Sequence, residues 1–133
     1  MRIVEIEGVG PEYAAKLEAA GVKTTDDLLD RAAKSGGRKK LAEETGITEK
    51  LILKWVNRAD LVRIPGVGSE YSDLLEAAGV DSPAELIQRN AANLAATFQE
   101  LNAARGTVRR IPSEATVAEW IKAAKKLPKV VEH

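Results

Sequence analysis

One segment occurs twice in this chain, as IEGVGPEYAAKLEAAGV at residues 6–22 and as IPGVGSEYSDLLEAAGV at residues 64–80. The two copies align without a gap at an offset of 58, and the similarity continues for several residues beyond them. So much identity does not arise by chance. The chain therefore contains an internal duplication, which has to be recognised before the fold is interpreted.

The tryptophans mark a second pair of related segments. LILKWVNRADL (51–61) resembles VAEWIKAAKKL (117–127), with Trp55 opposite Trp120 at an offset of 65. The second copy therefore holds about seven more residues before its tryptophan. Both tryptophans lie in apolar helical stripes, which predicts that both belong to the core.

The duplication predicts two units, residues 1–60 and residues 61–133, that share one core with pseudo-twofold symmetry. A helix carrying Trp55 precedes the second Gly-Val-Gly turn, whereas no helix precedes the first. We therefore expect the Trp120 helix to pack against the first turn and to fill that vacancy.

Short helices explain the apolar spacing in both copies, and no segment alternates with period two, so the sequence predicts an all-α fold. Capping boxes at Thr24-x-x-Asp27 and Ser82-x-x-Glu85 begin a helix in each copy. Gly36-Gly37 is expected to break the chain. Further helices are expected near residues 38–45, 49–60, 91–104 and 114–127, with a connector over Gly106–Pro112.

The composition limits the chemistry. Among the 133 residues there is no cysteine, and the only histidine is His133. Thiolate chemistry, a histidine-based metal site and a serine–histidine pair are therefore not expected. The N-terminus lacks an apolar signal core, and no run approaches the ~20 apolar residues of a membrane span. We expect a cytoplasmic protein without enzymatic activity, cofactor, metal or membrane partner.

The charges balance, with 20 Lys+Arg against 20 Asp+Glu. A protein that binds nucleic acid mainly by releasing counterions usually has a basic excess. Nucleic-acid binding by this chain would therefore depend on local basic patches.

A Gly-apolar-Gly turn places the first amides of the following helix where they can hold a phosphate. The segment IPGVGSEYSDLLEAAGV, with its capped following helix, resembles the helix-hairpin-helix motif of DNA repair and recombination proteins. The whole chain, including WVNRADL and VRRIP, resembles a bacterial family of small tandem helix-hairpin-helix proteins, a domain of unknown function. The resemblance implies a tandem helix-hairpin-helix (SAM-like) bundle, with phosphate-facing positions at Gly8, Gly10, Gly66 and Gly68.

Acidic residues distinguish the two turns. DNA-binding versions of the motif commonly carry Lys or Arg beside the hairpin, whereas this chain has Glu12 and Glu70. Glu5 and Glu7 also precede the first turn, and a carboxylate satisfies the same helix dipole as a phosphate. Arg63 precedes the second turn, which is therefore the better candidate phosphate site. The alternative is that both turns only pack helices.

Residues 38–58 also match a helix-turn-helix template, with Ala42, Gly46, Ile47, Ile52 and Trp55 at the required positions. The second helix would then be the recognition helix. Glu49 and Leu53, however, occupy positions where polar base-reading side chains are expected. The basic candidates in this region are the stripe Lys50, Lys54 and Arg58 and the cluster Arg38, Lys39 and Lys40.

The last helix carries a third basic group, Lys122, Lys125, Lys126 and Lys129, with Arg105, Arg109 and Arg110 upstream. A solvated face with ion pairs to Glu114 and Glu119 is the alternative interpretation. If the two tryptophan helices lie side by side, their basic stripes merge into one surface.

Tyr13 and Tyr71 recur one turn after each hairpin, and burial explains them better than base stacking.

Two functions remain open. One is a non-enzymatic helical module that binds nucleic acid, DNA above all, through the second turn and the basic stripes. The other is a protein-interaction or scaffolding module that binds no nucleic acid.

Overall fold

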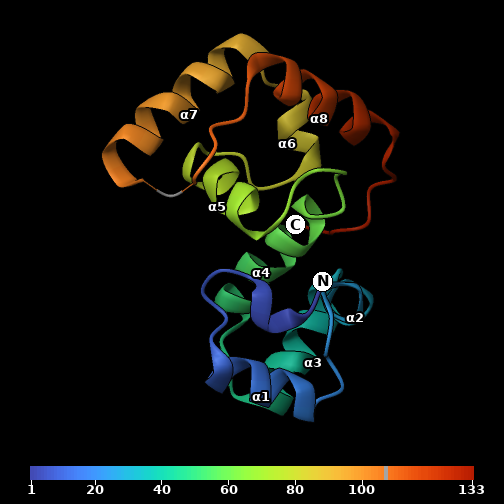
Figure 1. The fold of residues 1–133 in the computed structure, drawn as a ribbon. Helices are drawn as coiled ribbons and strands as arrows, with labels where there is room; N and C mark the ends of the chain where they lie inside the picture. The colour runs from blue at the N-terminus through green and yellow to red at the C-terminus, as the bar shows by residue number, and fades with distance from the viewer. Residues whose placement is uncertain (107) are drawn as a thin grey trace. The chain divides into compact units, whose positions relative to one another are not determined.

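The computed structural model describes residues 1–106 and 108–133, so Thr107 of the predicted connector lies outside the described residues. The described residues form eight α-helices and one short 3-10 helix and contain no strand, which confirms the all-α prediction (Figure 1). None of these helices is long and apolar enough to cross a membrane. The elements are η1 (Ile3–Glu5), α1 (Pro11–Ala19), α2 (Thr25–Ala32), α3 (Ser35–Thr45), α4 (Glu49–Leu61), α5 (Ser69–Ala77), α6 (Pro83–Ile87), α7 (Ala91–Arg105) and α8 (Glu114–Lys126).

The chain divides into two compact units. The first consists of Met1–Asp60 with Val130–His133, and the second of Leu61–Lys129. The buried apolar residues form two clusters, one in each unit, where the sequence predicts one shared core. Each unit can bury its own apolar surface because each has its own tryptophan helix.

Each tryptophan packs within its own unit. The ring centroids of Tyr13 and Trp55 are 5.1 Å apart, and those of Tyr71 and Trp120 are 5.2 Å apart. Trp120 also lies 6.4 Å from the Phe98 ring of α7. The prediction that the Trp120 helix fills a vacancy at the first turn is therefore wrong. Trp55 of α4 packs against the first turn, because α4 follows that turn in the chain just as α8 follows the second turn.

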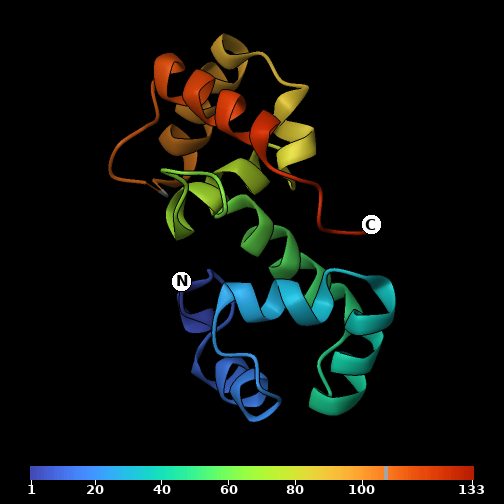
Figure 2. The same cartoon turned by 90° about the vertical axis from the view of Figure 1, so that its right-hand side faces the viewer.

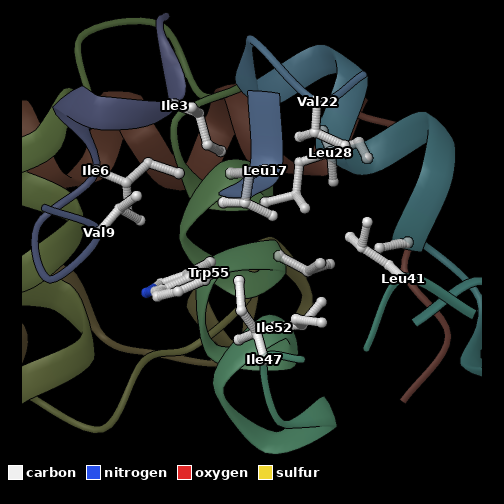
Figure 3. Packing of buried hydrophobic residues seen from close by; sticks show 14 of the residues in the cluster. Ile3, Ile6, Val9, Leu17, Val22, Leu28, Leu41, Ile47, Ile52 and Trp55 are labelled. Atoms are coloured by element: carbon white, nitrogen blue, oxygen red, sulfur yellow. The ribbon is translucent and has the colours of Figure 1, made fainter. Parts of the chain in front are cut away.

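Apolar side chains from η1 and α1 to α4 converge in the first unit, with Trp55 among them (Figure 3). The last residues of the chain complete this core. Val131 is buried in it, and the Glu132 amide donates to the Ala33 carbonyl at 2.8 Å. Arg38 Nη2 donates to the Glu132 carbonyl at 2.6 Å. Residues 130–133 therefore belong to the first unit, although the sequence assigns them to the second.

The second unit is built around α8. Helices α6 and α7 pack against it, as Figures 1 and 2 show from two sides. The fully buried side chains Leu74, Leu75, Leu86 and Phe98 surround the nearly buried Trp120. This packing holds one face of α8 inward and leaves the lysines of its opposite face exposed.

Side-chain caps begin the helices that follow α1 and α5. Thr24 Oγ1 accepts from the Asp27 amide at 3.1 Å, and the Asp27 carboxylate accepts from the Lys23 and Thr24 amides. These backbone hydrogen bonds, that from Lys23 above all, lower the pKa of Asp27. In the second copy Ser82 Oγ accepts from the Glu85 amide at 3.2 Å, but the Glu85 carboxylate accepts from Arg89 at 3.1 Å.

Gly36 and Gly37 do not break the chain, contrary to the sequence prediction, because both lie in the first turn of α3. A Cβ on Gly37 would lie 2.0 Å from the Arg31 carbonyl oxygen. A Cβ on Gly36 would meet nothing within 4 Å. Gly37 is therefore required by the close approach of α2 to α3, and the pair is not a flexible linker.

This difference makes the two glycines a matched pair. Gly37→Ala is expected to lower the free energy of unfolding by about 2 kcal/mol or more, because the backbone must move to relieve the clash. Gly36→Ala is expected to raise it by about 0.5–1 kcal/mol through helix propensity. Urea denaturation followed by tryptophan fluorescence measures both. Equal effects at the two positions would contradict the close packing of α2 and α3.

Candidate nucleic-acid interface

The second glycine turn (residues 64–68) is shaped by one glycine and one tryptophan. Gly66 has φ +89°, and a Cβ there would lie 3.2 Å from Trp120 Nε1. Val67 points into the core, and its amide donates to the Ile64 carbonyl at 3.0 Å. The first amides of α5, which begins at Ser69, have no partner within the helix.

The first glycine turn (residues 6–10) has the same construction. Gly8 has φ +90°, a Cβ there would lie 3.9 Å from Trp55 Nε1, and Val9 is fully buried. The second glycine of each pair does not have positive φ, since Gly10 has φ −1° and Gly68 has φ −103°. A Cβ at either position would face open space. The first glycine of each turn is therefore required by its positive φ.

Acidic side chains stand at the start of both following helices. Glu12 and Glu70 are exposed in the first turns of α1 and α5, where the helix dipole favours a carboxylate. Glu5 is used locally, because its carboxylate accepts from the Arg2 amide at 2.8 Å. The Glu7 carbonyl accepts from Arg58 Nη1 at 2.9 Å, so the first turn is already bonded to a cation of its own unit.

A pocket of about 420 Å³ lies beside the second turn. Arg63 and Pro65 line it from the turn, and α8 lines it from the other side. Three of its lining side chains are cationic and one is acidic. The structure thus brings three predicted residues together next to Gly66. The α8 residues of the lining are Glu119, Lys122, Ala123 and Lys126, followed by Leu127.

The three cations of this pocket differ in exposure and in contacts. Arg63 is half-buried, and its Nη2 donates to the Pro128 carbonyl at 3.1 Å. Lys122 and Lys126 are exposed one helical turn apart, so their stems lie on the same face of α8. Lys125 and Lys126 also stand in the last turn of α8, where they offset the helix dipole. Lys126 therefore contributes to stability as well as to the charge of the pocket.

Arg110 lies at a separate cavity of about 310 Å³ at the start of α8. Tyr71 Oη donates to the Arg110 carbonyl at 2.9 Å, so the tyrosine ties the segment before α8 to α5. Arg105 and Arg109 are exposed near it in the chain. The remaining lining residues of the cavity are Ile111, Pro112, Ser113 and Thr116.

The tyrosines are less buried than the sequence predicts. Tyr13 is 37% exposed, and Tyr71 is half-buried. Each ring packs on a tryptophan with one side and reaches the surface with the other. Their recurrence is explained by the tryptophan contact.

Two basic residues that the sequence places in the exposed cluster and stripe are buried instead. Arg38 is 5% exposed, and its Nη1 donates to the Ala32 and Ala33 carbonyls at 3.1 and 2.8 Å. Arg58 is also 5% exposed and bonds to the first glycine turn. Both guanidinium groups satisfy backbone carbonyls of their own unit, so they do not extend the basic cluster or stripe. The other predicted cations of the first unit, Lys39, Lys40, Lys50 and Lys54, are exposed.

The helix-turn-helix spacing over residues 38–58 corresponds to α3, a turn at Gly46 and α4. Ile47, Ile52 and Trp55 are buried as the template requires. Leu53, expected to be exposed, is half-buried. The apolar spacing is thus explained by packing in the first unit.

The sequence prediction missed a pair of arginines at equivalent positions. Arg31 Nη1 donates to the Ala20 carbonyl at 2.8 Å, and Arg89 Nη2 donates to the Gly79 carbonyl at 3.3 Å. Their separation equals the repeat offset of 58, and each donates to a carbonyl just after the end of α1 or α5. Extending the alignment past Ile87 reveals them. No alignment signal identifies Pro65, Ala123 and Leu127 as pocket residues.

The fold and the site define an all-helical protein with a cation-lined pocket beside a glycine turn. Residues 7–127 match the family described as a domain of unknown function (DUF4332), and the chain belongs to this family. No curated protein and no solved structure matches the chain. Within residues 1–106 and 108–133, no group of three or more His, Cys, Asp or Glu side chains could hold a metal ion.

The glycines of the second turn provide a matched test of its construction. Gly66→Ala is expected to destabilise the second unit by about 1–3 kcal/mol, because it combines positive φ with a close approach to Trp120. Gly68→Ala is expected to change stability by less than about 0.5 kcal/mol. Thermal unfolding followed by near-ultraviolet circular dichroism measures the difference. A Gly68→Ala variant as unstable as Gly66→Ala would refute the turn geometry.

Proposed function

We propose that this chain is a non-enzymatic module of two helix-hairpin-helix units that binds nucleic acid through its second turn. The gathering of Arg63, Lys122 and Lys126 in one pocket beside Gly66 carries this proposal. These residues come from two segments far apart in the sequence, and the fold of the second unit brings them to one place. DNA is the nucleic acid that the helix-hairpin-helix resemblance favours.

Electrostatics supports the second turn over the first. The formal net charge of the chain is zero, so attraction to a polyanion has to come from local charge. The pocket supplies three cations against the single acid Glu119. The charged residues in and beside the first turn, Glu5, Glu7 and Glu12, are acidic, and the Arg58 guanidinium that bonds to this turn is buried. We therefore assign phosphate contact to the second turn alone.

The geometry supports contact with the phosphate backbone. The amides at the start of α5 and the cations of α8 are groups that bind phosphate without reading bases. Glu70 in the first turn of α5 opposes an anion there and weakens the contact. We therefore expect sequence-independent binding with a Kd of about 10⁻⁴ to 10⁻⁶ M at physiological salt.

Absence of catalysis is part of the proposal. The sequence contains no cysteine, and its one histidine, His133, hydrogen-bonds to Asn57 in the first unit. No serine is therefore paired with a histidine base, as acyl-transfer chemistry of the usual kind requires. These residues therefore support a module that binds a ligand and positions it without catalysing a reaction.

Salt titration of DNA binding tests the proposal. Binding of a fluorescent duplex and of a single strand is measured between about 50 and 200 mM salt, where phosphate contacts make the affinity fall steeply. The double variant Lys122→Gln/Lys126→Gln is expected to bind more weakly. The slope of log K against log salt should shrink by about 0.9 for each lysine that contacts a phosphate.

Lys23→Gln is the matched control, because Lys23 is an exposed lysine of the first unit outside every candidate site. It should leave both the affinity and the slope unchanged. If neither DNA form binds at about 50 mM salt, nucleic-acid binding is rejected in favour of a protein-interaction module.

A further inference from the structure

The pocket of the second unit occupies the position that a buried arginine fills in the first. When the tryptophans are aligned, Arg58 corresponds to Ala123, and the repeat offset makes Glu7 correspond to Pro65. Arg58 Nη1 bonds to the Glu7 carbonyl at 2.9 Å, whereas Ala123 and Pro65 line a pocket. The substitution of alanine for arginine has thus left room next to the second turn.

The two positions are comparable because the surrounding frame is the same. The tyrosine–tryptophan distances, 5.1 and 5.2 Å, differ little between the units. The first glycines also agree, since Gly8 has φ +90° and Gly66 has φ +89°. Residue 123 therefore stands at the second turn where residue 58 stands at the first.

The charged side chains also differ between the two positions. Glu5 beside the first turn corresponds to Arg63 beside the second. On the tryptophan helix, Asn57 corresponds to Lys122, whereas Lys54 corresponds to Glu119 in the opposite sense. On balance the second position is the more basic, because Arg63, Lys122 and Lys126 line its pocket against the single acid Glu119. An anion is the ligand that completes such a pocket.

We infer that this pocket binds a phosphate monoester, the group found at the end of a nucleic-acid strand or on a mononucleotide. A monoester carries about −1.5 to −2 charges at pH 7, which matches three cations and one glutamate. It has a substituent on one side only, so it enters a pocket more readily than an internal diester. Pro65, Ala123 and Leu127 provide apolar surface for the attached sugar. The nucleic-acid form of this inference rests on the proposed function.

The variant Ala123→Arg tests the pocket directly. It recreates the arginine of the first unit, so its side chain is expected to fill the pocket and to bond to the Pro65 carbonyl without unfolding the protein. Ala96→Arg is the control, because Ala96 is exposed on α7, which contributes no residue to the pocket. Both variants add the same charge and the same volume. Circular dichroism verifies that both remain folded.

The probes are one single-stranded DNA oligonucleotide with phosphate at both ends and the same strand with hydroxyl groups at both ends. Wild type and Ala96→Arg should each bind the phosphorylated strand about tenfold more tightly than the strand with hydroxyl ends, as expected for new hydrogen bonds to a charged group. Ala123→Arg should bind the two strands equally. If wild type binds both strands equally, the pocket does not hold the terminal phosphate of a strand, although nucleic-acid binding itself stands.

A mononucleotide distinguishes this inference from the proposed function. Adenosine monophosphate and adenosine are titrated into the full chain, and backbone amide resonances are followed by NMR. The amides of residues 122 and 123 should shift with the monophosphate and not with adenosine, and they should not shift in Ala123→Arg. This result supports the pocket even if no oligonucleotide binds. No shift with the monophosphate, together with no preference for phosphorylated ends, overturns the inference.

Discussion

The packing of an indole ring beneath a glycine of positive φ is the constraint on which each unit depends. A Cβ on Gly66 would approach Trp120 Nε1 to 3.2 Å, and a Cβ on Gly8 would lie at an ordinary contact distance of 3.9 Å from Trp55 Nε1. Trp55 Nε1 is buried without a hydrogen-bond partner among the described residues, a condition that typically costs about 1–3 kcal/mol. Burial of the ring offsets that cost. The contact fixes the tryptophan helix against the turn and so determines which helical side chains stand beside it.

From this shared frame the units have diverged in charge. The first unit closes its turn with the buried guanidinium of Arg58, which bonds to the Glu7 carbonyl. The second places Ala123 at the corresponding position and surrounds the resulting pocket with cations. A duplicated unit can thus keep one copy for stability and adapt the other for binding, because the frame does not depend on the residue at this position. The acids near the first turn and the cations near the second are consistent with that division.

Local sequence signals predicted the helices well, because a capping side chain such as Thr24 and the apolar spacing act within a few residues. Features that depend on how one segment packs against another were not predicted. Nothing local indicates that Arg38 and Arg58 reach backbone carbonyls, or that Gly37 touches the Arg31 carbonyl. The cations of the candidate site were predicted locally, Arg63 from its place before the second turn and Lys122 and Lys126 from their helical spacing. The apolar residues that line the pocket were not predicted, because the role of Ala123 becomes visible only when α8 lies against the turn.

The central claim, that the second turn binds phosphate and the first does not, is tested most directly by the two indole N–H resonances. The chain has two tryptophans, and each indole nitrogen lies beneath the first glycine of one turn. During an NMR titration with a DNA oligonucleotide at low salt, the Trp120 indole resonance should shift and the Trp55 resonance should stay in place. A shift of the Trp55 resonance, with or without a shift of Trp120, or saturable DNA binding that moves neither resonance, would contradict the claim.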